Sequence, residues 1–143
     1  MKRLVVFVLL LIGAIILYYW MSTRHLSPTV RMKEKLLAVE LQRAGYGARY
    51  IPISGFRPVW LNCLLPLASK KSTHRHGKAI DILVLDINGD WRINKRDVML
   101  VVAALERIDR REKKLKGGLG TYFQSFPWMV HFDANGSGRR WNY

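Results

Sequence analysis

The chain of 143 residues has room for one domain, and half of its residues are hydrophobic, which suffices for a packed core. Its net charge of +14 attracts polyanions, so nucleic acid, acidic lipid headgroups and an anionic cell wall are all candidate partners. The single cysteine, Cys63, excludes an intrachain disulfide, and its apolar neighbours predict a buried thiol.

Residues 1–24 predict a transmembrane helix that precedes the domain. Met1-Lys2-Arg3 is a short basic head, and the run from Leu4 to Met21 is apolar and uncharged. A spanning helix needs about 20 apolar residues, and the aromatic residues 18–20 would lie at the headgroup level. No small-residue cleavage site follows, which favours an uncleaved signal anchor over a cleaved signal peptide. Basic residues on both sides leave the orientation open.

The rest of the chain, residues 25–143, predicts alternating helices and strands. Ser27-Pro28 is typical of a helix start, and an apolar stripe at helical spacing extends to Gly45. A second apolar stripe at helical spacing is followed by a cluster of basic residues and then by Gly117-Gly118, which end the predicted helix. We expect helices over residues 29–44 and 95–114, and strands over residues 50–53, 79–85, 119–123 and 128–132, the last two forming a hairpin.

A stretch rich in carboxylates and amides, residues 86–97, has two interpretations. Asp86, Asn88 and Asp90 match positions 1, 3 and 5 of a calcium-binding loop, with the Arg92 carbonyl at position 7 and Asp97 at position 12. However, Trp91 replaces the usual glycine at position 6, and Asp97 is shorter than the usual glutamate. Alternatively, Asn94 caps the following helix and Asp97 completes a capping box. A calcium ion here would be structural.

The strongest motif lies at residues 72–81, which read S-x-H-x-x-G-x-A-x-D. Asp81 falls in an apolar strand, where a carboxylate is costly unless a partner or a metal satisfies it. With His131, which lies in another apolar stretch, His74 and Asp81 can hold a zinc ion on three sides. The open fourth position is typical of a catalytic zinc site. His76 competes with His74 as a ligand.

This motif resembles the signature of the zinc D-Ala-D-Ala carboxypeptidase family, which shares its fold with the hedgehog signalling domain and the vancomycin-resistance D,D-dipeptidases. Ser54-Gly55-Phe56-Arg57-Pro58 with Asn62 is similar to the family segment S-G-[FY]-R-[ST]-P…N. Residues 117–122, 130–133 and 139–141 resemble the closing motifs of the murein endopeptidase branch, G-G-[LV]-G-x-Y, V-H-[VI]-D and R-x-W. The resemblance covers roughly residues 30–143.

The resemblance implies a role for each site residue. His74, Asp81 and His131 would be the zinc ligands, with a variable residue at His76, and Arg57 would bind a carboxylate or carbonyl of the substrate. Related enzymes place a general base two or three residues before the last zinc ligand, where this chain has Trp128 and Met129. Asp133 is the remaining candidate for the base; alternatively, it only orients His131.

Together these patterns predict an α+β fold in which a small antiparallel sheet, flanked by helices, carries the zinc site. The expected function is a zinc peptidase, anchored in the bacterial cytoplasmic membrane, that hydrolyses peptidoglycan stems or cross-links as a carboxypeptidase or endopeptidase. Its domain would lie on the periplasmic or extracellular side, where that substrate is. The alternatives are an inactive zinc-bearing binding module and a phage lysis endopeptidase. Few aromatic residues interleave with the basic residues 110–116, so no nucleic-acid partner is expected. The oligomeric state is open.

Overall fold

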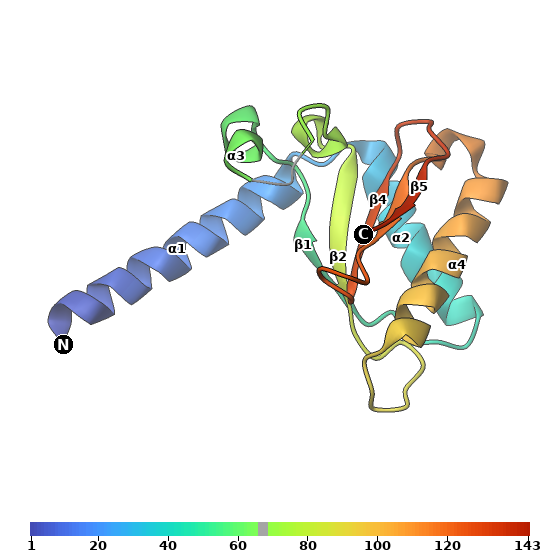
Figure 1. Ribbon diagram of the computed structural model, residues 1–143, viewed down its shortest axis with the longest axis horizontal. Helices are drawn as coiled ribbons and strands as arrows, with labels where there is room; N and C mark the ends of the chain where they lie inside the picture. Colours follow the sequence, from blue (N-terminus) through green and yellow to red (C-terminus); the bar gives the residue numbers. More distant parts are fainter. Residues whose placement is uncertain (66–68) are drawn as a thin grey trace.

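The computed structural model describes residues 1–65 and 69–143. Five strands form one sheet in the order β1-β2-β4-β3-β5, and helices α2 and α4 pack together on one of its faces (Figure 1). The strands are β1 (Tyr50–Ser54), β2 (Ala79–Val84), β3 (Leu119–Thr121), β4 (Met129–Asp133) and β5 (Arg140–Asn142). The helices are α1 (Lys2–Arg24), α2 (Pro28–Arg43), α3 (Val59–Leu64) and α4 (Lys95–Arg111), with short 3-10 helices η1 (Thr73–His76) and η2 (Lys113–Leu115). The fold is therefore α+β, as predicted.

Helix α1 extends away from the domain and is long and apolar enough to cross a membrane (Figure 1). Its apolar stretch is not covered by the rest of the chain, which agrees with the predicted membrane helix. A signal sequence has the same length and composition near an N-terminus, so the helix alone does not separate these two roles.

Helices α2 and α4 begin where their capping residues predict. The Ser27 hydroxyl accepts a hydrogen bond from the Val30 N–H (3.4 Å), and Pro28 opens the first turn of α2. At the start of α4, Asn94 and Asp97 form a complete capping box. The second helix is shorter than predicted, because α4 ends at Arg111 and η2 follows as a separate turn.

The predicted antiparallel sheet is wrong in one respect: the sheet is mixed. Strands β1, β2, β4 and β3 pair antiparallel in that order, but β5 pairs parallel to β3. The chain turns back after β4 and then pairs with β3, which already runs opposite to β4. A strand that reverses in this way must run parallel to β3. Residues 139–141 were predicted as part of a motif, and a strand was not predicted there.

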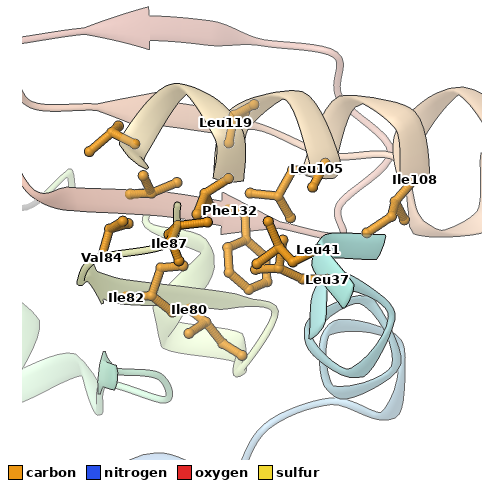
Figure 2. Packing of buried hydrophobic residues seen from close by; sticks show 14 of the residues in the cluster. Leu37, Leu41, Ile80, Ile82, Val84, Ile87, Leu105, Ile108, Leu119 and Phe132 are labelled. Carbon is orange, nitrogen blue, oxygen red and sulfur yellow. The ribbon is translucent and has the colours of Figure 1, made fainter. Parts of the chain in front are cut away.

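The hydrophobic core lies between the sheet and the two helices (Figure 2). Leu37 and Leu41 of α2 and Leu105 and Ile108 of α4 meet the core face of the sheet, around the buried ring of Phe132. Because side chains alternate along a strand, the residues between the core positions point to the other face. On β2 and β4 those alternate residues are Asp81, His131 and Asp133.

Helix α3 contradicts the prediction that Cys63 is buried, because this thiol is exposed. The neighbouring Val59, Trp60 and Leu64 are also exposed, whereas the polar Asn62 of the same helix is buried. A short apolar stretch predicts burial only if another element packs against it. In the described part of the chain, the outer side of α3 has no such cover.

Candidate metal centre

Strand register brings two of the three predicted ligands together. In the antiparallel pair β2–β4, Asp81 lies directly opposite His131 on the face away from the core. The carboxylate Oδ1 of Asp81 is 2.8 Å from Nδ1 of His131. This pairing joins residues that are 50 positions apart in the sequence.

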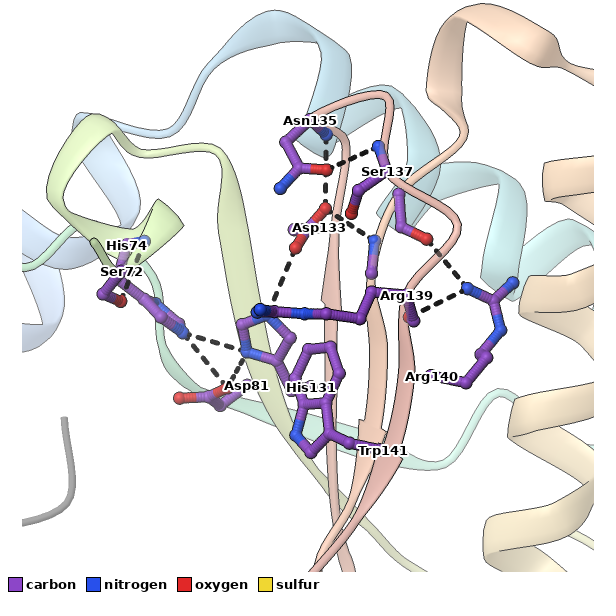
Figure 3. Close-up of polar contacts among 12 residues, drawn as sticks. Ser72, His74, Asp81, His131, Asp133, Asn135, Ser137, Arg139, Arg140 and Trp141 are labelled. Atoms are coloured by element: carbon purple, nitrogen blue, oxygen red, sulfur yellow. Dashed lines mark hydrogen bonds and ion pairs between the residues drawn. The ribbon is translucent and has the colours of Figure 1, made fainter. Parts of the chain in front are cut away.

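The third ligand, His74, comes from η1, which precedes β2. The Ser72 hydroxyl accepts a hydrogen bond from the His74 N–H (3.4 Å) and so caps this turn. Gly77 ends it with a left-handed φ of 63°, and a side chain there would collide with the carbonyl of His25. Nε2 of His74 thereby lies 3.2 Å from Asp81 Oδ1 and 3.1 Å from His131 Nδ1 (Figure 3).

In each imidazole one nitrogen faces the group (the inner nitrogen) and the other faces away from it (the outer nitrogen). The contact of the outer nitrogen determines whether the inner nitrogen carries a proton or a lone pair. Nδ1 of His74 is 2.6 Å from the carbonyl oxygen of Gly55, which only accepts, so this nitrogen carries the proton. Nε2 of His131 faces the carboxylate of Asp133 at 3.6 Å, which likewise favours a proton on that nitrogen. In these neutral tautomers both inner nitrogens carry lone pairs. Two imidazole nitrogens with lone pairs and a carboxylate oxygen thus lie within 3.2 Å of one another.

The separations of these three atoms fit a metal ion. A tetrahedral zinc with bonds of about 2.0–2.1 Å keeps its ligand atoms about 3.3 Å apart. The observed separations of 3.1 and 3.2 Å are close to that value, and the 2.8 Å between Asp81 Oδ1 and His131 Nδ1 is shorter. In the part of the chain that the structure describes, these residues are the only such group of His, Cys, Asp or Glu side chains, and all three are buried. The group can hold a metal ion, and the neighbouring His76 is exposed, outside it.

The electrostatics of the group agree with this chemistry. Burial alone would raise the pKa of Asp81, but the charge and hydrogen bonds of His74 and His131 outweigh it and hold that pKa well below its usual range. Burial lowers the pKa of His131, but the carboxylates of Asp133 and Asp81 outweigh this effect and raise the pKa to about 9. Without a metal, a proton therefore occupies the centre at neutral pH.

Arg57 lies at the edge of the group rather than in open solvent. Its Nη2 donates to Asp81 Oδ2 (2.9 Å) and to the Ser54 hydroxyl (3.1 Å). Its backbone N–H donates to the His74 carbonyl (2.9 Å), which ties the two predicted site segments together. The structure therefore shows Arg57 bonded to the second carboxylate oxygen of Asp81, a contact that the sequence does not predict.

Asp133 lies behind His131, on the side away from Asp81 and His74 (Figure 3). Its Oδ1 accepts from the backbone N–H groups of Gly118 (2.7 Å) and Asn135 (3.2 Å), and the side chain is buried. Burial raises the pKa of Asp133, but the bonds from His131 and Gly118 lower it overall. This placement favours the orienting role over that of a general base.

The indole of Trp141 packs on His131, with the ring centroids 5.1 Å apart. Trp141 pairs with Gly120 across the parallel strands, and a side chain at Gly120 would collide with the indole. The glycine at residue 120, in the motif of residues 117–122, therefore leaves space for the tryptophan of the final R-x-W motif, which packs on His131. Both motifs are visible in the sequence, but their contact is not.

Ser22 supports the site, although the sequence did not predict this role. Its hydroxyl accepts from the Gly55 N–H (2.6 Å), and the carbonyl of the same Gly55 receives the proton of His74 Nδ1. Ser22 is only 2% exposed, although it belongs to the last turn of α1. A single serine at the end of an apolar run carries no signal for such a contact.

In the predicted calcium loop, residues 86–97, the carboxylate oxygens accept hydrogen bonds mainly from backbone N–H groups of the same loop. Asp97 accepts from the N–H groups of Ile87, Asn88 and Asn94, as the capping-box interpretation predicts. Asp86 accepts from three backbone N–H groups and from Arg49, and Asp90 accepts from the N–H of Arg92. Trp91 has a left-handed φ of 65° at the position where calcium loops carry glycine. The capping is confirmed, and a bound calcium ion stays a prediction.

Comparison with models of protein families, with curated proteins and with solved structures found no match. The family resemblance therefore depends on the sequence motifs alone.

Proposed function

We propose that this chain is a membrane-anchored zinc peptidase that hydrolyses peptide bonds in peptidoglycan. The observation that carries the proposal is the convergence of His74 Nε2, His131 Nδ1 and Asp81 Oδ1, with each imidazole tautomer held from behind. The same residues stand at the ligand positions of the motif that resembles zinc carboxypeptidases and murein endopeptidases.

The donor set favours zinc over the alkaline-earth metals. Two imidazole nitrogens and one carboxylate oxygen are typical of catalytic zinc, whereas calcium and magnesium prefer oxygen ligands only. A zinc ion bound here would supply a Lewis acid that polarises a peptide carbonyl and activates water. Three protein ligands leave a position open for this chemistry.

The residues around the centre support substrate binding. A guanidinium has five N–H donors, and the bonds of Arg57 to Asp81 and Ser54 use Nη2 alone. Arg57 therefore has donors left for a carboxylate or carbonyl oxygen of a peptide. The net charge of +14 favours binding to peptidoglycan stems, which carry carboxylates, when the domain lies on the outer side of the membrane.

A second candidate function is a zinc-bearing module that binds peptidoglycan without cutting it. The position of Asp133 favours this alternative, since its carboxylate is buried behind His131 and occupied by backbone N–H groups. A hydrolase needs a group within reach of the attacking water to take its proton. Trp128 and Met129, at the positions where related enzymes carry that group, cannot serve.

The test is muropeptide release by the full chain in lipid nanodiscs. The protein is loaded with zinc and incubated with purified sacculi, and the products are identified by mass spectrometry with and without a chelator. We expect cleavage that the chelator abolishes. His74→Ala and Asp81→Ala should lose both the metal and the activity, whereas the exposed His76→Ala serves as the matched control and should keep both.

Either of two outcomes would contradict the peptidase. Full activity in His74→Ala or Asp81→Ala would remove the metal assignment. Absence of products from a folded, zinc-loaded protein would favour the binding module, which a sedimentation assay with sacculi then measures directly.

A further inference from the structure

Helix α3 exposes its apolar face and buries a polar residue, the reverse of an ordinary amphipathic helix. Val59, Trp60, Cys63 and Leu64 lie at helical spacing on one face, and this face is exposed: Trp60 by 63% and Leu64 by 71%. The polar Asn62 points inward and donates to the carbonyl of Ser69 (3.0 Å). An exposed apolar face of this kind on a small domain marks a surface that another phase or partner covers.

The position of α3 indicates what covers it. Phe56, three residues before α3, donates its N–H to the carbonyl of Ser22 (2.9 Å), and its ring lies 5.1 Å from that of His25. Three residues span at most about 10 Å, so α3 begins close to the last turn of α1. Figure 1 shows α3 beside that end of α1. The apolar face therefore lies near the place where α1 leaves the domain.

Aromatic and basic residues at this place fit the surface of a lipid bilayer. Tyr19 and Trp20 are exposed near the end of α1, and tyrosine and tryptophan are enriched where a helix leaves the membrane. The guanidinium of Arg24 lies over the Trp20 ring at 4.8 Å. The bond from Asn62 to Ser69 ties α3 to the exposed pair Lys70-Lys71, which can reach anionic headgroups.

We propose that α3 is a second membrane contact: its apolar face lies in the interfacial layer of the same bilayer that α1 spans, flanked by the basic residues Arg24, Lys70 and Lys71 on anionic headgroups. This inference depends on the part of the proposed function that makes α1 a membrane helix, and it does not depend on catalysis. The segment between β1 and α3 contains Gly55 and Arg57, which hold His74 and Asp81. Because α1 contacts this segment at Gly55 and α3 follows it directly, two membrane contacts would keep the metal centre at a constant height above the bilayer.

Cys63 allows the test in the native sequence, because it is the only cysteine and lies on the proposed contact face. The full chain is spin-labelled at Cys63 and reconstituted in nanodiscs of phosphatidylethanolamine and phosphatidylglycerol. Electron paramagnetic resonance then compares collisions of the label with oxygen, which concentrates in the bilayer, and with a water-soluble nickel complex. We expect the ratio of oxygen to nickel collisions to be several-fold higher than at a control position in solvent.

Two matched labels complete the test, each in a Cys63→Ser background. Lys114 lies in η2, just past the C-terminal end of α4, and is exposed, so Lys114→Cys should report water. Helix α4 lies on the opposite side of the domain from α1 (Figure 1). Leu10→Cys lies in the middle of α1 and should report the bilayer interior. In the double variant Trp60→Ser/Leu64→Ser, the ratio of oxygen to nickel collisions at the Cys63 label should fall several-fold. The ratio at Leu10→Cys should not change.

A water-like signal at Cys63 together with a bilayer signal at Leu10→Cys would overturn the second contact and leave the anchor intact. A water-like signal at Leu10→Cys as well would overturn both. Because no readout involves hydrolysis, a failure of the peptidase proposal in the muropeptide assay stays distinguishable from a failure of this one.

Discussion

The two histidines of the centre present different nitrogens to it, and the difference follows from what lies behind each ring. His74 turns Nε2 inward because its Nδ1 donates to the Gly55 carbonyl, and His131 turns Nδ1 inward because its Nε2 faces Asp133. A ligand histidine whose outer nitrogen is held in this way keeps both its tautomer and its ring orientation. The two histidines of the centre are therefore held in place without a metal ion.

Zinc binding should release protons at neutral pH. In the metal-free protein, the carboxylates of Asp133 and Asp81 raise the pKa of His131 to about 9, so this ring is protonated at pH 7.5 and must lose its proton to bind a metal. We expect the release of about one proton for each zinc ion, measured by titration calorimetry in buffers of different ionisation enthalpy. Zinc affinity should rise with pH up to about pH 9 and then level off. An uptake of zinc without proton release would contradict the raised pKa.

The same residue sets a pH dependence of stability without metal. Because the pKa of His131 is raised above its ordinary value of 6.5, its contribution to the free energy of unfolding is fully present below about pH 6.5. That contribution is lost as the pH rises through about 9. Urea unfolding of the zinc-free protein across this range checks the sign, and His131→Ala, which lacks the titrating group, is the control.

Asp133→Asn should separate an orienting role from that of a general base. An amide at this position disturbs the proton on His131 Nε2, and loss of such a supporting group costs about 10–100-fold in metal affinity. If Asp133 only orients His131, as its contacts favour, excess zinc should restore most of the turnover number. Turnover that stays low at saturating zinc would instead assign the base to Asp133. Competition with a fluorescent chelator measures the affinity.

At the scale of secondary-structure elements, the last turns of α1 pack against the domain, although the rest of this helix is apolar enough to cross a membrane. Ser22 binds the Gly55 N–H, and the hydroxyl of Tyr18 is 3.1 Å from the hydroxyl of Ser54. Gly55 in turn holds η1 through His74, so three elements meet at one backbone unit. A side chain at Gly55 would collide with the Ser22 carbonyl and the Leu26 side chain, which explains the glycine at this point.

Ser22→Ala should therefore weaken a metal centre that it does not touch. Removal of the hydroxyl leaves the buried Gly55 N–H without its acceptor, and the carbonyl that orients His74 can then shift. We expect zinc affinity to fall by up to about tenfold, at the lower end of the effects of supporting residues. Thr23→Ala is the matched control, because its hydroxyl bonds only within α1. Equal affinities in the two variants would show that α1 and the centre are independent.

At the scale of the whole molecule, a buried ion pair connects the helical layer to the strand of the metal centre. The ammonium of Lys33 on α2 is fully buried, 2.5 Å from Asp109 of α4, and it donates to the Asp133 carbonyl on β4 (2.8 Å). Arg140 of β5 donates to the same Asp109 (2.9 Å). Burial is the largest influence on the pKa of Lys33 and lowers it, although Asp109 acts in the opposite direction.

Lys33→Ala should be among the most destabilising single substitutions in this chain. It leaves the Asp109 carboxylate buried with Arg140 alone, and breaking a buried pair costs about 3–5 kcal/mol in the free energy of unfolding. Urea denaturation followed by circular dichroism measures the loss, and Lys35→Ala, which removes an exposed lysine of the same helix, is the control. A loss below about 1 kcal/mol, typical of surface pairs, would contradict the burial of this network.

Local patterns in the sequence were enough to predict much of this architecture. Ser27, Asn94 and Asp97 mark the helix starts because capping depends on residues only a few positions apart. The apolar run of residues 79–85 predicts β2 because a short run of branched apolar residues is a pattern of adjacent residues. The three members of the candidate metal centre could be chosen because a resemblance to known motifs supplied the long-range information that spacing lacks.

The remaining features depend on contacts between distant parts of the chain, which local patterns do not encode. Asp81 meets His131 across 50 residues, and Lys33 reaches the carbonyl of Asp133 across 100. The parallel pairing of β5, the support from Ser22 and the inward position of Arg57 arise in the same way. Cys63 is the clearest case: its apolar neighbours predicted burial, yet burial requires a surface to pack against, and the position of that surface is a property of the folded chain.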